Sequence, residues 1–126
     1  MLTFDIKNSL TTSSVATPAS RTATLTTSGV DLRGYIGPVQ ITQHIGVVSG
    51  TSPTWDGTIE DSADNSSFAA VSGLAFTQVT ASTNLQTLNV DTRLVRRYIR
   101  YVGTIGGSST PTFNSAVTMI GQKATI

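Results

Sequence analysis

A strict alternation of side chains decides the fold; it reads Val39-Gln40-Ile41-Thr42-Gln43-His44-Ile45-Gly46-Val47. Successive side chains of a β-strand point to opposite faces of the sheet. The odd-numbered positions, from Val39 to Val47, therefore share one face, and Gln40, Thr42, His44 and Gly46 share the other. Because one face is mostly apolar and the other polar, the stretch predicts a strand that is half-buried in a sheet.

Further short strands are predicted on both sides of this stretch. Trp55 and Ile59 alternate with polar residues, and Leu88 and Val90 do the same later in the chain. Other strands are expected over residues 22–27, 68–71, 74–79 and 96–105, and around Phe113, Val117 and Met119. Turn residues such as Ser72-Gly73 separate them. About eight short strands at this spacing favour an all-β fold, a jelly-roll-like β-sandwich.

The composition agrees with an all-β domain. The 126 residues include 22 Thr and 15 Ser, while only 12% are charged. Threonine suits the half-exposed surface of a sheet, and this length fits one domain. Residues 10–20 are small and polar and show no period, so they can bury little area by themselves. We therefore expect an N-terminal arm over residues 1–28, extended or ordered by a partner, and a sandwich domain over residues 29–126.

Charge and cysteine content disfavour several classes of protein. The net charge of +1 offers no excess for gripping a phosphate backbone, so no direct contact with nucleic acid is expected. No apolar run is long enough for a membrane span, and residues 1–7 do not resemble a secretion leader. The absence of Cys excludes disulfides and thiolate metal sites. We expect neither a membrane partner nor a cofactor.

An acidic group falls between residues 56 and 64. Asp56, Glu60, Asp61 and Asp64 could supply oxygen ligands to calcium, although the EF-hand spacing is not met. The favoured alternative is a solvated hairpin loop in which Asp64-Asn65 makes the turn. Adjacent strand residues point to opposite faces, so Glu60 and Asp61 are poorly placed to flank one glycosidic bond. We predict no catalytic residues and no enzymatic activity.

A basic group follows between residues 93 and 100. Alternation places Arg96, Tyr98 and Arg100 on one face, with Ile99 and Tyr101 beside the core. Arg and Tyr are enriched in buried interfaces, so Arg93, Arg96, Tyr98 and Arg100 are predicted to form an interface. The alternative is local pairing of these arginines with the acidic group.

Two further side chains could bear chemistry. His44 is the only histidine, and with no second His and no Cys it predicts a polar strand face rather than a metal site. No Gly-x-Ser-x-Gly elbow accompanies the many serines. Trp55 could stack on a sugar ring, but its register with Ile59 favours a place in the core.

Two stretches resemble small structural proteins of tailed bacteriophages. The first runs Ile59-Glu60-Asp61-Ser62-Ala63-Asp64-Asn65-Ser66-Ser67-Phe68-Ala69-Ala70-Val71-Ser72-Gly73. The second comprises Arg97-Tyr98-Ile99-Arg100-Tyr101-Val102 and the closing segment 113–122. The resemblance spans residues 35–122, and its motifs are short.

This resemblance implies a capsid cement, or decoration, protein. Such a protein is a non-enzymatic virion component, assembled in the host cytoplasm. It binds the outer surface of the major capsid protein shell and stabilises the expanded head. A homo-oligomer is implied, with a trimer favoured over a dimer, and the arm could add strands to a neighbour. The alternative is a carbohydrate-binding jelly-roll module of a head fibre or tail protein, using Tyr98, Arg100 or the acidic group. A third hypothesis is a tail-tube or head-completion subunit.

Overall fold

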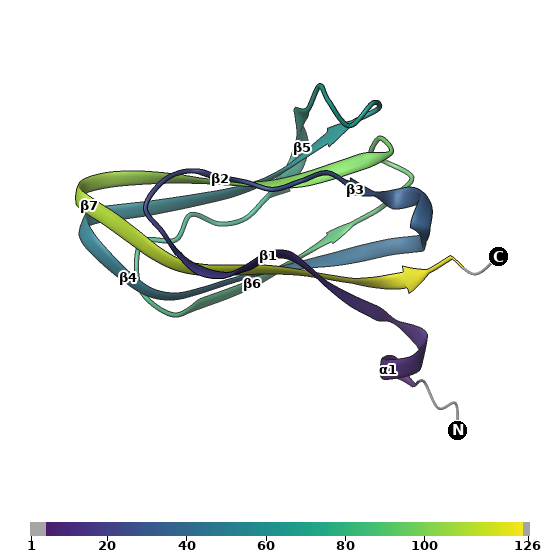
Figure 1. The fold of residues 1–126 in the computed structure, drawn as a ribbon, viewed down its shortest axis with the longest axis horizontal. Coiled ribbons are helices and arrows are strands. Elements are labelled where there is room, and N and C mark those ends of the chain that lie inside the picture. Colours follow the sequence, from purple (N-terminus) through teal and green to yellow (C-terminus); the bar gives the residue numbers. More distant parts are fainter. Residues whose placement is uncertain (1–4, 125–126) are drawn as a thin grey trace.

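The structure is a computed structural model that describes residues 5–124. Two short helical turns, α1 (Ile6–Ser9) and η1 (Leu32–Gly34), accompany strands that account for most of the chain (Figure 1). The strands are β1 (Thr11–Arg21), β2 (Leu25–Thr26), β3 (Val30–Asp31), β4 (Tyr35–Ser62), β5 (Ala69–Ala75), β6 (Asn84–Val90) and β7 (Tyr98–Lys123).

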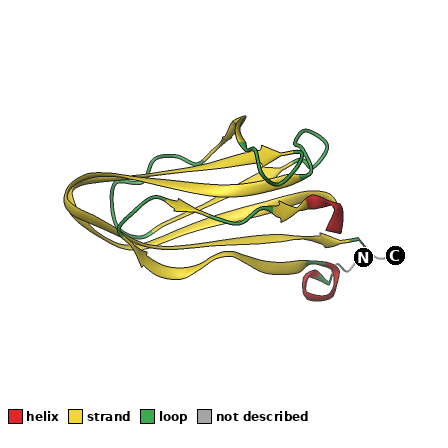
Figure 2. Cartoon of the chain, turned by 45° about the horizontal axis from the view of Figure 1, so that its top comes forward, coloured by secondary structure: helices red, strands yellow, loops and turns green. Residues whose placement is uncertain are grey.

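Two of these strands, β4 and β7, are long and run through both layers of the fold. Residues 35–49 of β4 pair antiparallel with residues 112–123 of β7, and residues 51–62 pair with residues 98–108. Both strands bend together between these two stretches, at one end of the molecule (Figures 1 and 2). Each long strand therefore supplies one segment to each sheet.

The remaining strands complete two four-stranded layers. In sheet I, β1 pairs with the second half of β7, and β6 pairs with the first half of β4. In sheet II, β2 and β3 pair with the first half of β7, and β5 pairs with the second half of β4. Counting eight segments along the chain, the sheet orders are 1-8-3-6 and 2-7-4-5, which is the jelly-roll arrangement. The predicted fold class is confirmed.

The bend requires backbone conformations that few residues tolerate. Gly50 on β4 has φ +110° and Gly107 on β7 has φ +114°, in the left-handed region that favours glycine. A Cβ at Gly50 would lie 2.7 Å from the Cα of Pro111 on the neighbouring strand. The two strands can therefore turn side by side because a side chain is missing at this contact.

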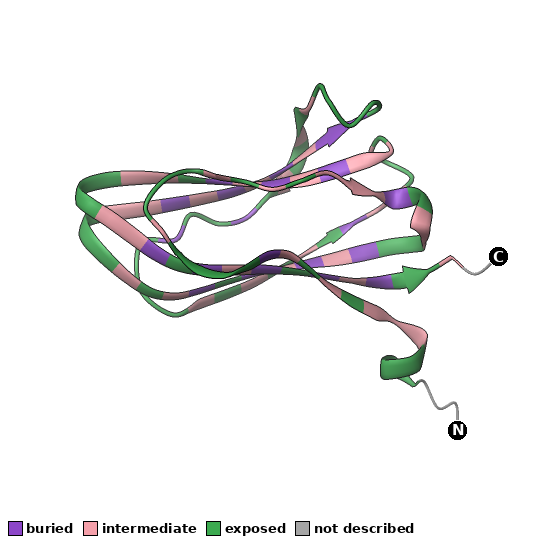
Figure 3. Ribbon diagram, viewed as in Figure 1, coloured by how far each residue is buried: buried purple, intermediate pink, exposed green. Residues whose placement is uncertain are grey.

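Large aromatic side chains fill the space between the sheets. Trp55, Tyr101 and Phe113 are almost fully buried, and the ring centroids of Trp55 and Phe113 lie 5.3 Å apart. The prediction that Trp55 belongs to the core is confirmed. Gly103 faces the indole, and a Cβ there would approach Trp55 Cζ2 within 2.2 Å. Burial alternates along β4 and β7 as Figure 3 shows.

A chain of buried hydrogen bonds links the two sheets. Trp55 Nε1 donates to the Tyr101 hydroxyl at 2.7 Å, and that hydroxyl donates to Gln43 Oε1. Gln43 comes from sheet I, whereas Trp55 and Tyr101 come from sheet II. Burial raises the pKa of the Tyr101 phenol, so this donor stays protonated. Gln43, the polar residue within the apolar face of residues 39–45, thus has a hydrogen-bond partner across the core.

Two details of the predicted strands are wrong. Val47 was expected on the buried face, but it is 66% exposed because the pairing of β4 with β7 shifts register between Ile45 and Val48. Residues 68–71 and 74–79 were expected to form two strands separated by a turn at Ser72-Gly73, but β5 runs through that turn as one strand from Ala69 to Ala75. Val79 beyond it makes an isolated bridge to Trp55.

The segment predicted as an N-terminal arm is extended, and its own chain holds it. Residues 11–21 form the edge strand β1 of sheet I, and Ala16 is buried in the core. Leu25 and Thr26 then pair with β7 in sheet II. The predicted boundary at residue 28 therefore does not divide an arm from the sandwich, because β1 and β2 are strands of the sandwich itself. Composition could not reveal this, because the partner strand of β1 lies about 100 residues further along the chain.

Gly103→Ala should destabilise the fold. The added methyl group would overlap the Trp55 indole, and overpacking of this kind costs about 1–3 kcal/mol of unfolding free energy. Gly34→Ala is the matched control, since nothing lies within 4 Å of its Cβ position. Urea denaturation of both variants measures the difference, and equal stability of the two would contradict this account of the core.

Deletion of residues 1–28 should abolish the cooperative unfolding transition, because it removes β1 and β2 from both sheets. Deletion of residues 1–10 leaves β1 in place and should preserve that transition. Circular dichroism through a thermal ramp distinguishes them. A shortened chain starting at residue 29 that still melts cooperatively would restore the independent arm.

Candidate functional site

The arginines of the predicted interface lie at the end of sheet II, opposite the bend. Arg96 donates to Asp61 from its backbone N (2.9 Å), from Nε (3.0 Å) and from Nη2 (2.8 Å). Asp61 is buried, with a side chain only 12% exposed. Burial acts to raise the pKa of Asp61, but the hydrogen bonds from Arg96 outweigh it and the pKa falls below its usual value.

Two neighbouring arginines form similar pairs. Arg100 contacts Glu60 at 2.7 Å, and its guanidinium lies 4.2 Å from the ring centroid of Phe68. Arg97 contacts Asp31 at 2.8 Å. Hydrogen bonds from the Arg97 side chain and from the Arg33 backbone lower the pKa of Asp31 to about 2. Three ion pairs therefore fasten residues 96–100, which lead into β7, to β4 and β3.

These contacts match the alternative prediction, in which the arginines pair locally with the acidic group. Arg96 and Arg100 are paired within the chain to two members of the acidic group. Tyr98 lies beside Arg97, whose guanidinium is 4.9 Å from its ring centroid. Arg93 has the most exposed side chain of the three predicted interface arginines at 87%, and it pairs with Asp91. An interface through these four residues remains a prediction, and Arg93 is its most accessible member.

The acidic group does not converge on one point. Asp56 accepts from Gln78, Glu60 and Asp61 hold arginines, and Asp64 accepts from the backbone of Ser66 and Ser67. These turn contacts, led by that from Ser67, lower the pKa of Asp64 to about 2. Within residues 5–124, no three His, Cys, Asp or Glu side chains gather as metal ligands would. Asp64 therefore lies in a turn as the solvated-loop prediction expects, whereas Asp61 is buried, which that prediction did not expect.

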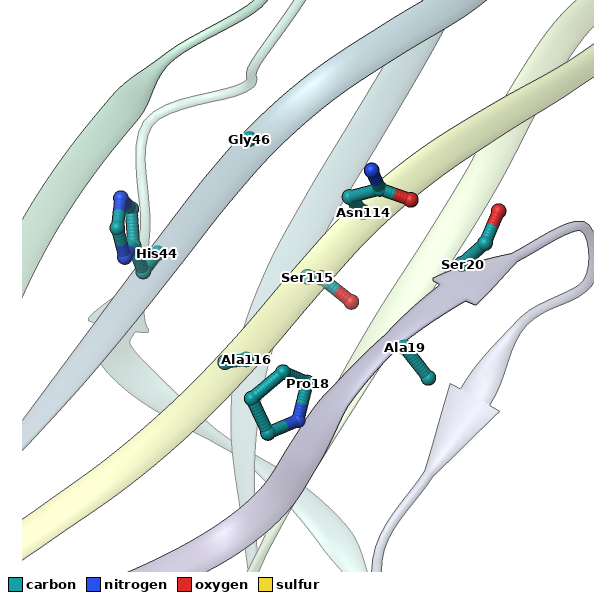
Figure 4. A pocket seen from close by; sticks show the side chains of 8 residues that line it. All are labelled: Pro18, Ala19, Ser20, His44, Gly46, Asn114, Ser115 and Ala116. Atoms are coloured by element: carbon teal, nitrogen blue, oxygen red, sulfur yellow. The ribbon is translucent and has the colours of Figure 1, made fainter.

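A shallow hollow of about 440 Å³ crosses the outer face of sheet I (Figure 4). Its lining includes His44, Ser20 and Ser115, along with small side chains such as Gly46 and Ala116. The imidazole and the Ser20 hydroxyl lie on opposite sides of the hollow, and no carboxylate lines it (Figure 4). The lining residues do not bring an acid, a base and a nucleophile together, so we consider this hollow as part of a binding surface.

The outer face of sheet I carries no Asp, Glu, Lys or Arg. Its side chains alternate with buried neighbours on β4, β6 and β7, and they form rows across the sheet. We call this set the neutral face; it comprises Gln40, Thr42, His44, Leu85, Thr87, Asn89, Ala116, Thr118 and Ile120. The sequence predicted the polar side of residues 40–46, but not that two other strands extend it into a broad uncharged surface.

Comparison with known proteins gives little further information. No family model matches the chain, and no curated protein matches it. A chain from a solved structure described as "Bacillus endospore appendages form a novel family of disulfide-linked pili" is similar at 14% identity and a TM-score of 0.48. The match covers 92% of this chain and 90% of that chain, and at this level it carries no argument about function. No helix among residues 5–124 is long and apolar enough to cross a membrane.

Asp31→Asn should make the protein less sensitive to acid. The pKa of Asp31 is about 2 in the fold against 3.8 in its absence, so the carboxylate stabilises the fold above pH 4 or so. That contribution is lost as the pH falls from about 5 to about 2. Denaturant titrations across this window should show a smaller loss of unfolding free energy in Asp31→Asn than in the natural protein.

Arg97→Gln removes the other partner and should reduce the acid sensitivity in the same direction. Both variants should be less stable than the natural protein at neutral pH. An acid profile in either variant as steep as that of the natural protein would show that the pair contributes nothing.

Proposed function

We propose that this chain is a non-enzymatic virion structural protein, a capsid decoration protein that binds the outer surface of a major capsid protein shell. The neutral face is the observation that carries this proposal. The cores of protein interfaces are depleted of charged residues, because a buried charge without a partner is costly. An uncharged face across three adjacent strands can be covered by a partner without that cost.

The side chains of the neutral face suit a broad contact made of many weak bonds. Thr42 lies opposite Thr118 on one side and Thr87 on the other, so hydroxyl groups run across the sheet. Many copies on a symmetric shell would add such contacts into strong attachment, even where each is weak. The jelly-roll fold and the resemblance to phage structural proteins support the same proposal.

The carbohydrate-binding alternative has less support. Sugar recognition commonly uses an exposed aromatic ring, but Trp55 is buried in the core, and the Arg97 guanidinium lies 4.9 Å from the centroid of the Tyr98 ring. Arg100 is held by Glu60 and Phe68, and the carboxylates of the acidic group bind partners within the chain. The neutral face contains no aromatic side chain other than the imidazole of His44.

Thr118→Lys tests the proposal, with Thr104→Lys as its matched control. Both threonines are exposed on β7, Thr118 on sheet I and Thr104 on sheet II. Cosedimentation with expanded heads of the phage that encodes the chain measures binding. We expect Thr118→Lys to weaken binding at least tenfold, about 1.4 kcal/mol, while Thr104→Lys binds normally.

Two results would count against the proposal. The natural protein could fail to cosediment with the heads, which would remove the capsid as the partner. Equal binding by both lysine variants would instead show that the neutral face is not the surface that meets the shell. Melting temperatures of both variants check that each one is folded.

A further inference from the structure

Leu94 is the most exposed large apolar residue in the described part of the chain. Its side chain is 79% exposed at the tip of the loop formed by residues 91–97, which we call the Leu94 loop. The sequence singled out the arginines around this leucine but not the leucine itself. Transfer of this side chain from water into an apolar pocket is favourable, so Leu94 can serve as an anchor for a partner.

The Leu94 loop is held in place by hydrogen bonds at its start, tip and end. Thr92 Oγ1 donates to the carbonyl of Gly37 at 2.9 Å, and the Leu94 backbone N donates to the carbonyl of Asp91 at 2.9 Å. Arg96 closes the loop through its contacts with Asp61. Leu94 therefore stands exposed on an ordered support, so a partner would not have to bear the entropy cost of ordering it.

The same chain contains an apolar groove that could receive such an anchor. Its apolar lining comes from α1, from the start of β4 and from the end of β7, and its volume is about 430 Å³. We call this the apolar groove; it is lined by Ile6, Leu10, Pro38, Val39 and Ile120, with Gln40, Asn89 and Gly121 at its margins. No charged residue among residues 5–124 lines it, and Ile6 is 61% exposed.

We infer that Leu94 of one copy inserts into the apolar groove of a second copy of this chain. Within one copy the two features do not meet, because Leu94 remains largely exposed on its fixed loop. They lie at the same end of the sandwich, where α1 and the segment between β6 and β7 are found (Figure 1). A second copy approaching that end would cover Leu94 and Ile6 together.

Charge supports a second copy as the occupant. A hollow lined by Asp91 and Arg93 adjoins the groove, and the two share Pro38 and Asn89. With Leu94 of one copy in the groove, its Arg93 would be brought to the hollow that holds Asp91 of the receiving copy. The exposed pair within each chain, 3.0 Å between Arg93 Nη2 and Asp91 Oδ2, can then be replaced by one between chains. Reciprocal insertion gives a two-fold dimer, and head-to-tail insertion gives a ring if the rotation between copies closes.

Disulfide trapping tests the contact directly, because the natural chain has no Cys. Leu94→Cys and Ile6→Cys are prepared as separate, differently tagged proteins, mixed, and oxidised with oxidised glutathione. A disulfide needs Cβ atoms about 3.5–4.5 Å apart, so a mixed covalent dimer forms efficiently only if the two positions meet. Val47→Cys, an exposed apolar position at 66% outside the neutral face, replaces Ile6→Cys in the control.

We expect the Leu94→Cys and Ile6→Cys mixture to give at least tenfold more mixed dimer than the control mixture. A yield no higher than the control overturns the inference. So does a Leu94→Cys sample that crosslinks with itself as efficiently as the mixture, because that result indicates contact between two loop tips.

Solution mass by light scattering provides a second readout. Leu94→Ser should weaken self-association at least tenfold, whereas Val47→Ser should leave it unchanged, and both should melt like the natural protein. A natural protein that stays monomeric at all concentrations overturns the inference. So does Leu94→Ser that self-associates as strongly as the natural protein. Trapping and mass use no heads, so the capsid proposal stands or falls separately.

Discussion

The continuous pairing of β4 with β7 is the constraint on which the rest of the molecule depends. The two strands pair on both sides of the bend, and although the register shifts at the bend, this pairing fixes the facing residues in both sheets. It aligns Ile41 with Met119 in sheet I and Ile59 with Tyr101 in sheet II. The same register brings Glu60 opposite Arg100, so the ion pairs at one end and the core packing are set together.

Local alternation carried most of the fold information in the sequence. It placed residues 39–45 and Trp55 correctly, since a half-buried strand needs only its own period to be recognised. It could not place the bend inside β4 and β7, nor the pairing of residues 11–21. Those features depend on partners far away in sequence. Val47 is an example: its odd-numbered position predicts the apolar face, but a register shift exposes it.

The candidate surfaces could be anticipated in part. The sequence showed both the acidic and the basic group, and local pairing between them was one of its two predictions. Which arginine pairs with which carboxylate depends on the register that brings Asp61 next to the start of β7. The neutral face had a signal in the absence of charges at alternate positions in 40–46 and 114–120. Leu94 had no such signal, because a single leucine between arginines in a loop does not differ in sequence from other leucines.

The position of the two ends gives the sandwich a direction in which it is mechanically weak. Thr11 at the start of β1 lies opposite Gly121 near the end of β7, and both ends of the described chain emerge on the same side (Figure 1). Tension applied between residues 5 and 124 would therefore open the β1–β7 hydrogen bonds one after another, as a zipper opens. Load carried through the broad outer face of sheet I would avoid that path, and the strands would resist it together.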